Sequence, residues 1–196
     1  MKIKPDYKKL FEIAEPQGGY FTTHQARAAG YSRKDVSSLA SSNKFSRIAY
    51  GVYRITYYPS TDHEDLIIAI LKSGPDAVVS NDSALSVYQL SDVLPGSIHI
   101  TIPKTRSRRQ KGITYHTCRI TDQEITSYNG LPITTVERTI TDVVRSGLDE
   151  LLVQQSIDQA IKRGMITTDS LQNQVNKYGK KIKNDINKFI DRFDDD

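Results

Sequence analysis

Two groups of residues have side chains that could bind a metal ion or transfer protons. The first is the adjacent run His63, Glu64 and Asp65. This run stands at an expected helix start, where acidic side chains interact favourably with the helix dipole. No second histidine follows at the spacing of the zinc-binding motif HExxH. We therefore expect the run to have a structural role.

The second group consists of three carboxylates, Asp82, Glu137 and Asp142, which could meet around a metal ion in the fold. The strand-borne D…E-x-K arrangement typical of nuclease sites is absent. His99 and His116, on expected facing strands, are interpreted as ordinary strand residues. The sequence has no glycine-rich phosphate loop and no defensible Cys-His or Ser-His-Asp grouping. The chain is predicted not to be an enzyme, and neither a metal nor another cofactor is expected.

The basic residues have a more informative distribution. The formal net charge is only +4, but residues 1–60 contain ten Lys or Arg against four Asp or Glu. In residues 104–111, five of the eight residues are also basic. Blocks of positive charge attract the phosphate groups of nucleic acids. The charge pattern therefore favours a nucleic acid as the partner.

The stretch 18–55 contains the elements that would position the first basic block. The expected order is a short strand, a first helix, a second helix and two strands, at residues 20–21, 24–29, 33–42, 45–48 and 52–55. The first helix opens at Thr22 or Thr23, and Gly30 suits its C-terminal end. Ser32 is a good N-cap for the second helix. This order predicts a helix-turn-helix followed by a β-hairpin wing.

The second helix has one apolar face and one polar, basic face. Val36, Leu39 and Ala40 share the face expected to pack inward. The other face suits a DNA major groove, where long basic side chains reach guanine edges or phosphates and short hydroxyls allow a close approach. The predicted DNA-binding residues are Arg33, Lys34, Ser37, Ser38 and Ser41 on this helix, Lys44, Arg47 and Arg54 around the hairpin, and Thr23 and Arg27 as phosphate contacts.

A small packing unit with solvated surface charges is the alternative interpretation of this stretch. The hairpin that follows directly and the local excess of positive charge favour DNA instead. The second basic block, Lys104, Arg106, Arg108, Arg109 and Lys111, has two interpretations as well. It is either a solvated loop or a salt-dependent contact with DNA phosphate, RNA or an acidic partner. The strands on either side of it, 98–102 and 113–118, are expected to pair as a hairpin.

The rest of the chain predicts an α+β domain with a helical C-terminal part. Capping boxes are expected at Thr61 with Glu64 and at Thr134 with Glu137, and Asn129-Gly130 predicts a tight turn. Amphipathic helices are expected at 148–163, 169–178 and 180–193. The predicted fold class is therefore α+β, with an N-terminal winged helix-turn-helix domain at 1–58 and an α+β domain at 61–196.

The composition is ordinary for a soluble globular protein. The single cysteine, Cys118, excludes an internal disulfide and fits a reducing compartment. The apolar run 66–71 is too short to span a membrane, and no secretory leader is evident. A cytoplasmic location without a membrane partner is expected.

The run GGYFTTHQARAAGYSRKDVSSLASSNKFSRIAYGVYRI at residues 18–55 resembles the winged-helix domain of the AbiEi family. The similarity continues through HEDLIIAILKSGPDAVVSNDSALSVYQLSDVLPGSIHITIP and LPITTVERTITDVV, to about Gly164. Members are the antitoxin and transcriptional repressor of bacterial type IV toxin-antitoxin pairs linked to abortive infection. The resemblance implies an autorepressor that binds inverted repeats in double-stranded DNA. It also implies a nucleotidyltransferase-like toxin as functional partner, neutralised without need for a stable complex.

Two other functions stay open at this point. Similar front halves precede a nuclease-like module in related bacterial proteins, so the chain could be a metal-dependent nuclease or nucleic-acid-modifying enzyme that the winged helix targets. Against this, only helices are expected after Gly164. The other alternative is a plain transcription factor whose second domain senses a ligand or mediates dimers.

Overall fold

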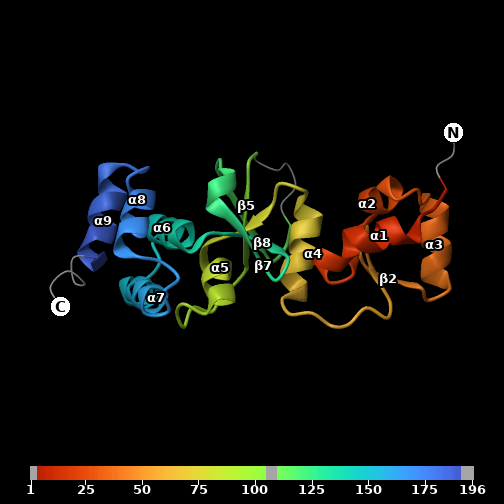
Figure 1. The fold of residues 1–196 in the computed structure, drawn as a ribbon, viewed down its shortest axis with the longest axis horizontal. Helices are drawn as coiled ribbons and strands as arrows, with labels where there is room; N and C mark the ends of the chain where they lie inside the picture. The colour runs from red at the N-terminus through yellow and green to blue at the C-terminus, as the bar shows by residue number, and fades with distance from the viewer. Residues whose placement is uncertain (1–3, 105–109, 191–196) are drawn as a thin grey trace. The chain divides into compact units, whose positions relative to one another are not determined.

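The computed structural model describes residues 4–104 and 110–190, which form two compact units. The first unit contains the residues up to Ala77 together with Ser127–Leu131, and the second contains Val78–Thr126 and the residues from Pro132 onward. Helices and strands occur in both units, so the fold is α+β, as predicted (Figure 1).

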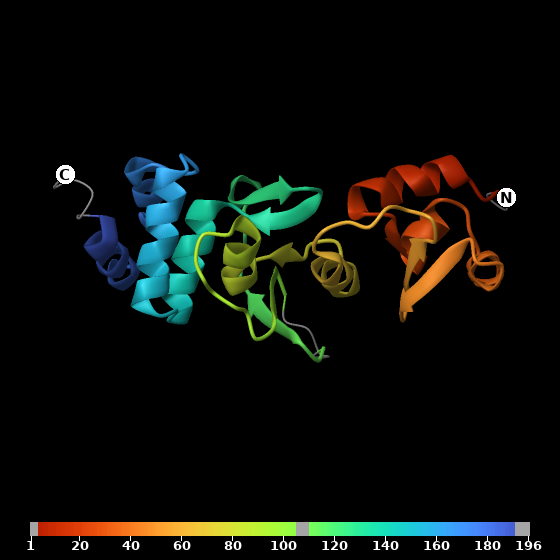
Figure 2. The ribbon, with the colours of Figure 1, turned by 90° about the horizontal axis from the view of Figure 1, so that it is seen from below.

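The first unit has the predicted order of helix, turn, helix and hairpin. A three-stranded antiparallel sheet has the order β1-β3-β2, and α3 lies beside β2 (Figure 2). The elements are α1 Tyr7–Ala14, a 3-10 turn Glu15–Gln17, β1 Tyr20–Thr22, α2 Thr23–Ala28, α3 Arg33–Ser41, β2 Phe45–Ala49, β3 Val52–Ile55 and α4 Glu64–Ser73.

Local capping explains why α2 and α3 start and stop where they do. Thr22 and Gln25 form a capping box at the start of α2, and Ser32 and Asp35 form another at the start of α3. The Ser32 hydroxyl accepts the amide of Asp35 at 3.2 Å, and the Asp35 carboxylate accepts the amide of Ser32 at 2.7 Å. Between the helices, Gly30 has a φ of 88°, which residues with a side chain rarely adopt. The predicted roles of Gly30 and Ser32 are confirmed.

Aromatic packing holds the helices of the first unit against its sheet. Phe21 and Phe45 are both buried, and their rings meet edge to face with centroids 4.9 Å apart. Val36 is buried in the same core, which fixes the inward face of α3 as predicted. Leu39 packs against this core and is partly buried. The opposite face of α3 is consequently turned to solvent.

Helix α4 groups with the first unit, although the sequence assigned it to the second domain. It contacts β1 and β3, and the Glu64 carboxylate lies 3.4 Å from the Arg54 guanidinium. The limits 1–58 and 61–196 stay a prediction about which parts fold on their own. The capping box expected at Thr61 is wrong, because α4 begins at Glu64 itself, and its N-cap His63 makes no side-chain capping bond.

The strands that follow Ala77 form a five-stranded mixed sheet of order β6-β5-β4-β8-β7. The helices α6 to α9 gather at the C-terminal end of the second unit, as the sequence predicts (Figure 1). The elements after Ala77 are β4 Val78–Val79, α5 Asn81–Tyr88, β5 Ile98–Ile102, β6 Ile113–Thr117, a 3-10 turn Asp122–Glu124, β7 Ile125–Tyr128, β8 Leu131–Thr134, α6 Val136–Ser146, α7 Glu150–Lys162, α8 Thr168–Val175 and α9 Lys180–Ile190.

The hairpin predicted for β5 and β6 is wrong, because the two strands are parallel. Ile98 pairs with Ile113 and Ile102 pairs with Thr117, so both strands run in the same direction. Alternating apolar residues fix the faces of a strand but not its direction relative to a neighbour. The end of β5 and the start of β6 therefore lie at opposite ends of the paired strands.

Of two local predictions in this region, the turn between β7 and β8 is confirmed and the cap at the start of α6 is wrong. Asn129 and Gly130 have φ values of 50° and 81°, which confirms the predicted tight turn. The capping box expected at Thr134 is wrong, since Thr135 is the N-cap of α6. Thr134 is the last residue of β8, and its buried hydroxyl lies 2.7 Å from the Thr139 hydroxyl.

A buried arginine joins three elements of the second unit. Arg138 on α6 is 3% exposed, and its Nε donates to Asp142 Oδ2 at 2.8 Å. Its Nη1 lies 3.1 Å from Glu124 Oε1, which also accepts a 2.7 Å hydrogen bond from Gln174 on α8. We call Glu124, Arg138, Asp142 and Gln174 the Arg138 network. The network connects the 3-10 turn before β7 with α6 and α8.

Candidate nucleic-acid interface

The exposed face of α3 carries all five of the helix residues predicted to contact DNA. Arg33, Ser37 and Ser41 follow one another at intervals of four residues, and Lys34 and Ser38 form a second such row. All five side chains are exposed. Arg33 and Lys34 make no ion pair within the part of the chain that the structure describes. Their charges are therefore available to a partner.

A hollow of about 450 Å³ lies between the starts of α2 and α3. Thr23, Arg27 and Arg33 line it, so the structure brings the two predicted phosphate contacts together with the first residue of α3. His24 lines it too and was missed from the sequence, although the spacing of three between His24 and Arg27 places both on one face of a helix. Two arginines beside the N-terminus of a helix suit a phosphate group.

The β2–β3 hairpin is anchored to the start of α2. The amide of Thr23 donates to the carbonyl of Gly51 at 2.9 Å, which holds the hairpin turn beside the hollow. Lys44 and Arg47 are exposed on or near β2. Tyr50 at the turn is 91% exposed and was not among the predicted contacts. The hairpin thus adds basic and aromatic groups to the polar side of the first unit.

Arg54 differs from the other predicted contacts, because its guanidinium already has partners within the first unit, and its contact with DNA stays a prediction. Its Nη2 donates to the carbonyls of Tyr58 and Pro59 at 3.1 and 2.8 Å, and it pairs with Glu64. The guanidinium carbon also lies 5.1 Å from the centre of the Tyr20 ring. These contacts occupy the guanidinium within the first unit. Arg54 therefore fastens β3 to the segment that leads to α4.

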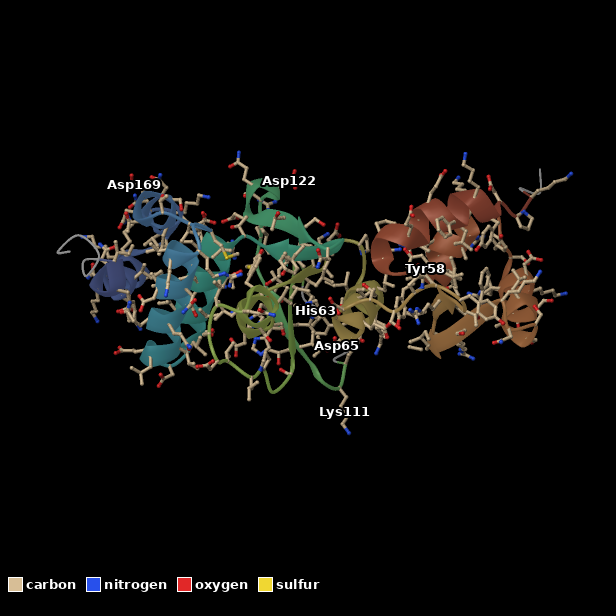
Figure 3. All side chains as sticks on the ribbon, turned by 60° about the horizontal axis from the view of Figure 1, so that its bottom comes forward. Tyr58, His63, Asp65, Lys111, Asp122 and Asp169 are labelled. Atoms are coloured by element: carbon tan, nitrogen blue, oxygen red, sulfur yellow. The ribbon has the colours of Figure 1, made fainter. Side chains whose placement is uncertain are left out.

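The second basic block is described only at its two ends. Lys104 and Lys111 are exposed, and the Lys111 side chain extends away from the ribbon (Figure 3). Arg106, Arg108 and Arg109 lie outside the described residues. A contact between this block and nucleic acid stays a prediction.

Two of the three carboxylates considered for metal binding, Asp82 and Asp142, lie beside other side chains of the protein. Asp142 is 1% exposed and pairs with Arg138 and Arg145, and Asp82 lies 3.9 Å from His99 Nδ1. Across residues 4–104 and 110–190, no three His, Cys, Asp or Glu side chains are grouped so that they could hold a metal ion. Glu64 pairs with Arg54, which agrees with the structural role expected for residues 63–65.

The imidazole rings of His99 and His116 lie within hydrogen-bonding distance of each other. His99 Nδ1 and His116 Nε2 lie 3.2 Å apart on the adjacent strands β5 and β6. Burial, followed by the charge of His99, lowers the pKa of His116. The uncharged form of His116 is therefore favoured at neutral pH, which suits a hydrogen-bonded pair of imidazoles.

The helices of the described segments include none that combines the length and apolar character needed to cross a membrane.

Part of the first unit matches a known protein family, and the chain has the fold of a solved structure. Residues 8–56 match the family described as "Transcriptional regulator, AbiEi antitoxin", which confirms the resemblance over this stretch. No curated protein sequence matches the chain. In the crystal structure of the RV2827C protein from Mycobacterium tuberculosis, 79% of that chain aligns with 96% of this one. The TM-score is 0.55 at 12% sequence identity, so the two share a fold.

Proposed function

We propose that this protein is a cytoplasmic DNA-binding autorepressor and the antitoxin of a type IV toxin-antitoxin pair. In this proposal α2, α3 and the β2–β3 hairpin act as a winged helix-turn-helix that binds double-stranded DNA. The observation that carries it is the exposed face of α3, where Arg33 and Lys34 stand without ion-pair partners among the described residues. The family match over residues 8–56 supports the same conclusion.

The geometry of the first unit fits a major groove in a definite way. With α3 in the groove, its short serines allow close approach, while Arg33 and Lys34 reach base edges or phosphates. Arg27 and Thr23, which line the hollow with Arg33, are suited to a phosphate of the same strand. Lys44 and Arg47 would contact the flanking backbone from the hairpin. An operator with inverted repeats would then bind two copies of the protein.

The description of the matched family supports an antitoxin activity, and we assign that activity to the second unit, which lies outside the matched residues 8–56. A nucleotidyltransferase-like toxin is the proposed functional partner, and a stable complex between the two is not required. We also propose that the chain itself is not an enzyme. The support for this is that Asp142, one of the three candidate carboxylates, is buried and paired with two arginines.

Co-expression with the neighbouring toxin gene tests the antitoxin proposal. Expressed from a foreign promoter, the full chain should restore the growth of cells that produce the toxin. The variant Arg33→Ala/Lys34→Ala should restore growth equally well, because repression plays no part under that promoter. Growth arrest that persists with the intact chain at matched protein level would contradict the antitoxin role. Rescue by the intact chain but not by the variant would move that role to the DNA-binding face.

A further inference from the structure

The first unit contains a second hollow, lined mainly by aromatic rings. Its volume is about 640 Å³, within the range of pockets that bind small molecules. Tyr31, Phe45 and Ile55 are buried and form its inner part, with exposed fractions of 7%, 2% and 8%. Tyr7 and Tyr57 also line it and are 53% and 85% exposed. We call this hollow the aromatic pocket.

The aromatic side chains at the mouth of the pocket are poorly covered by the protein itself. Tyr57 makes no ring contact and no hydrogen bond to any residue in the described ranges. Tyr7 lies near Phe11, and Phe11 lies near Tyr58, with ring centroids 6.3 and 6.1 Å apart. Exposed aromatic surface around a concave site is typical of a binding surface. A flat ring could stack on these side chains and cover them.

The charged residues at the pocket indicate which charge a bound ligand would carry. Lys44 is the one charged residue among those that line it, and its exposed ammonium has no ion-pair partner in the described chain. Asp6 and Asp35 lie near enough to Tyr31 to influence it. Neither of these carboxylates lines the pocket, however, whereas Lys44 does. An anionic ligand is therefore preferred over the cations that aromatic cages can also bind.

We propose that the aromatic pocket binds a small planar aromatic carboxylate, with its ring against Tyr57 and Tyr7 and its carboxylate at Lys44. Tyr31 is the one buried tyrosine that lines the pocket, and it also lines the hollow between α2 and α3. Burial, followed by the charges of Tyr7, Asp6 and Asp35, raises the pKa of Tyr31. Its hydroxyl therefore stays protonated at neutral pH and is able to donate a hydrogen bond.

Binding at this pocket would reach the helix that is proposed to read DNA. Leu39 on the inward side of α3 and Lys44 just beyond its end both line the pocket. A bound ligand would contact α3 from the core side and alter its position or mobility. The effect of the ligand on DNA binding rests on the proposed function, whereas binding of the ligand to the pocket does not. The ligand is then expected to change the affinity for operator DNA.

Calorimetric titration of the full chain with 2-naphthoate tests the pocket directly. We expect saturable one-to-one binding with a Kd on the order of 10–100 μM. Lys44→Gln and Tyr57→Ala should each weaken binding by about tenfold, since they remove the charge and the stacking surface. Lys8→Gln and Tyr50→Ala remove the same groups at exposed positions outside the pocket and should leave the Kd unchanged.

Several results would overturn this proposal. One is the absence of saturable 2-naphthoate binding. Another is an affinity for the cation 2-naphthylmethylammonium equal to that for 2-naphthoate. The third is that the control variants Lys8→Gln and Tyr50→Ala weaken binding as much as Lys44→Gln and Tyr57→Ala. Self-association that blocks 2-naphthoate and is lost in Tyr57→Ala would assign the pocket to a second copy of the chain instead. A separate measurement of DNA affinity keeps the two proposals apart. Intact 2-naphthoate binding without DNA binding would overturn the proposed function and leave the pocket standing.

Discussion

Replacing Arg33 and Lys34 together with alanine should weaken operator binding by about a hundredfold at moderate salt. Both side chains are exposed at the start of α3. Together they would supply base-edge or phosphate contacts and release counterions from the DNA. The slope of log affinity against log salt concentration should therefore become shallower by about one to two. Fluorescence anisotropy of a labelled operator over a series of salt concentrations measures both quantities.

The matched control is Lys8→Ala/Lys9→Ala. It removes the same two charges from exposed positions on α1. A general effect of net charge would weaken binding equally in both double variants. A specific role of α3 requires that the control stay within a few-fold of the wild type. Equal losses in the two variants would therefore contradict the assignment of α3 as the reading helix.

Replacing Arg138 with methionine should destabilise the second unit by about 3–5 kcal/mol. The change leaves two buried carboxylates, Glu124 and Asp142, without their shared cation. Arg138→Lys should have an intermediate effect, because one ammonium cannot reproduce the geometry of the guanidinium. Lys188→Met is the control, since Lys188 pairs with Asp185 at an exposed position, and should cost less than about 1 kcal/mol. Hydrogen exchange of α6 and α8 amides measures the local free energy of unfolding.

The Arg138 network also gives this variant a characteristic pH dependence. Burial opposes ionisation of Glu124, but hydrogen bonds from Thr121 and Gln174 and the charge of Arg138 outweigh it and lower its pKa to about 2. The folded protein therefore releases this proton more readily than the unfolded chain. The resulting stability is complete above pH 4.5 and is lost as the pH falls toward 2. The stability gap between wild type and Arg138→Met should narrow over that range, and a constant gap would contradict the ion pair.

Local signals allowed the helix-turn-helix to be predicted from the sequence. Thr22, Gly30 and Ser32 act through bonds and dihedral angles within a few residues, so their roles do not depend on the rest of the fold. The same holds for the turn at Asn129-Gly130. The capping prediction failed at Thr134, whose buried hydroxyl instead donates to the carbonyl of Val79 on β4 at 3.4 Å.

Contacts between distant segments were beyond the reach of sequence patterns. The pairing direction of β5 and β6 depends on the path of the chain between them, which alternation does not encode. Arg54 looked like any basic hairpin residue, but carbonyls of Tyr58 and Pro59 and the carboxylate of Glu64 occupy it. The Arg138 network was missed too. Its one sequence signal is the spacing of four between Arg138 and Asp142, which places both side chains on one face of α6.

In the function that we propose, the first unit binds a specific DNA site through α3. Footprinting of the full chain on the DNA upstream of its own gene tests this most directly. We expect protection of two inverted half-sites at nanomolar protein, with the same major-groove bases exposed again in the Arg33→Ala/Lys34→Ala variant. Protection that spreads uniformly over any DNA sequence, or that is identical in the variant, would contradict it.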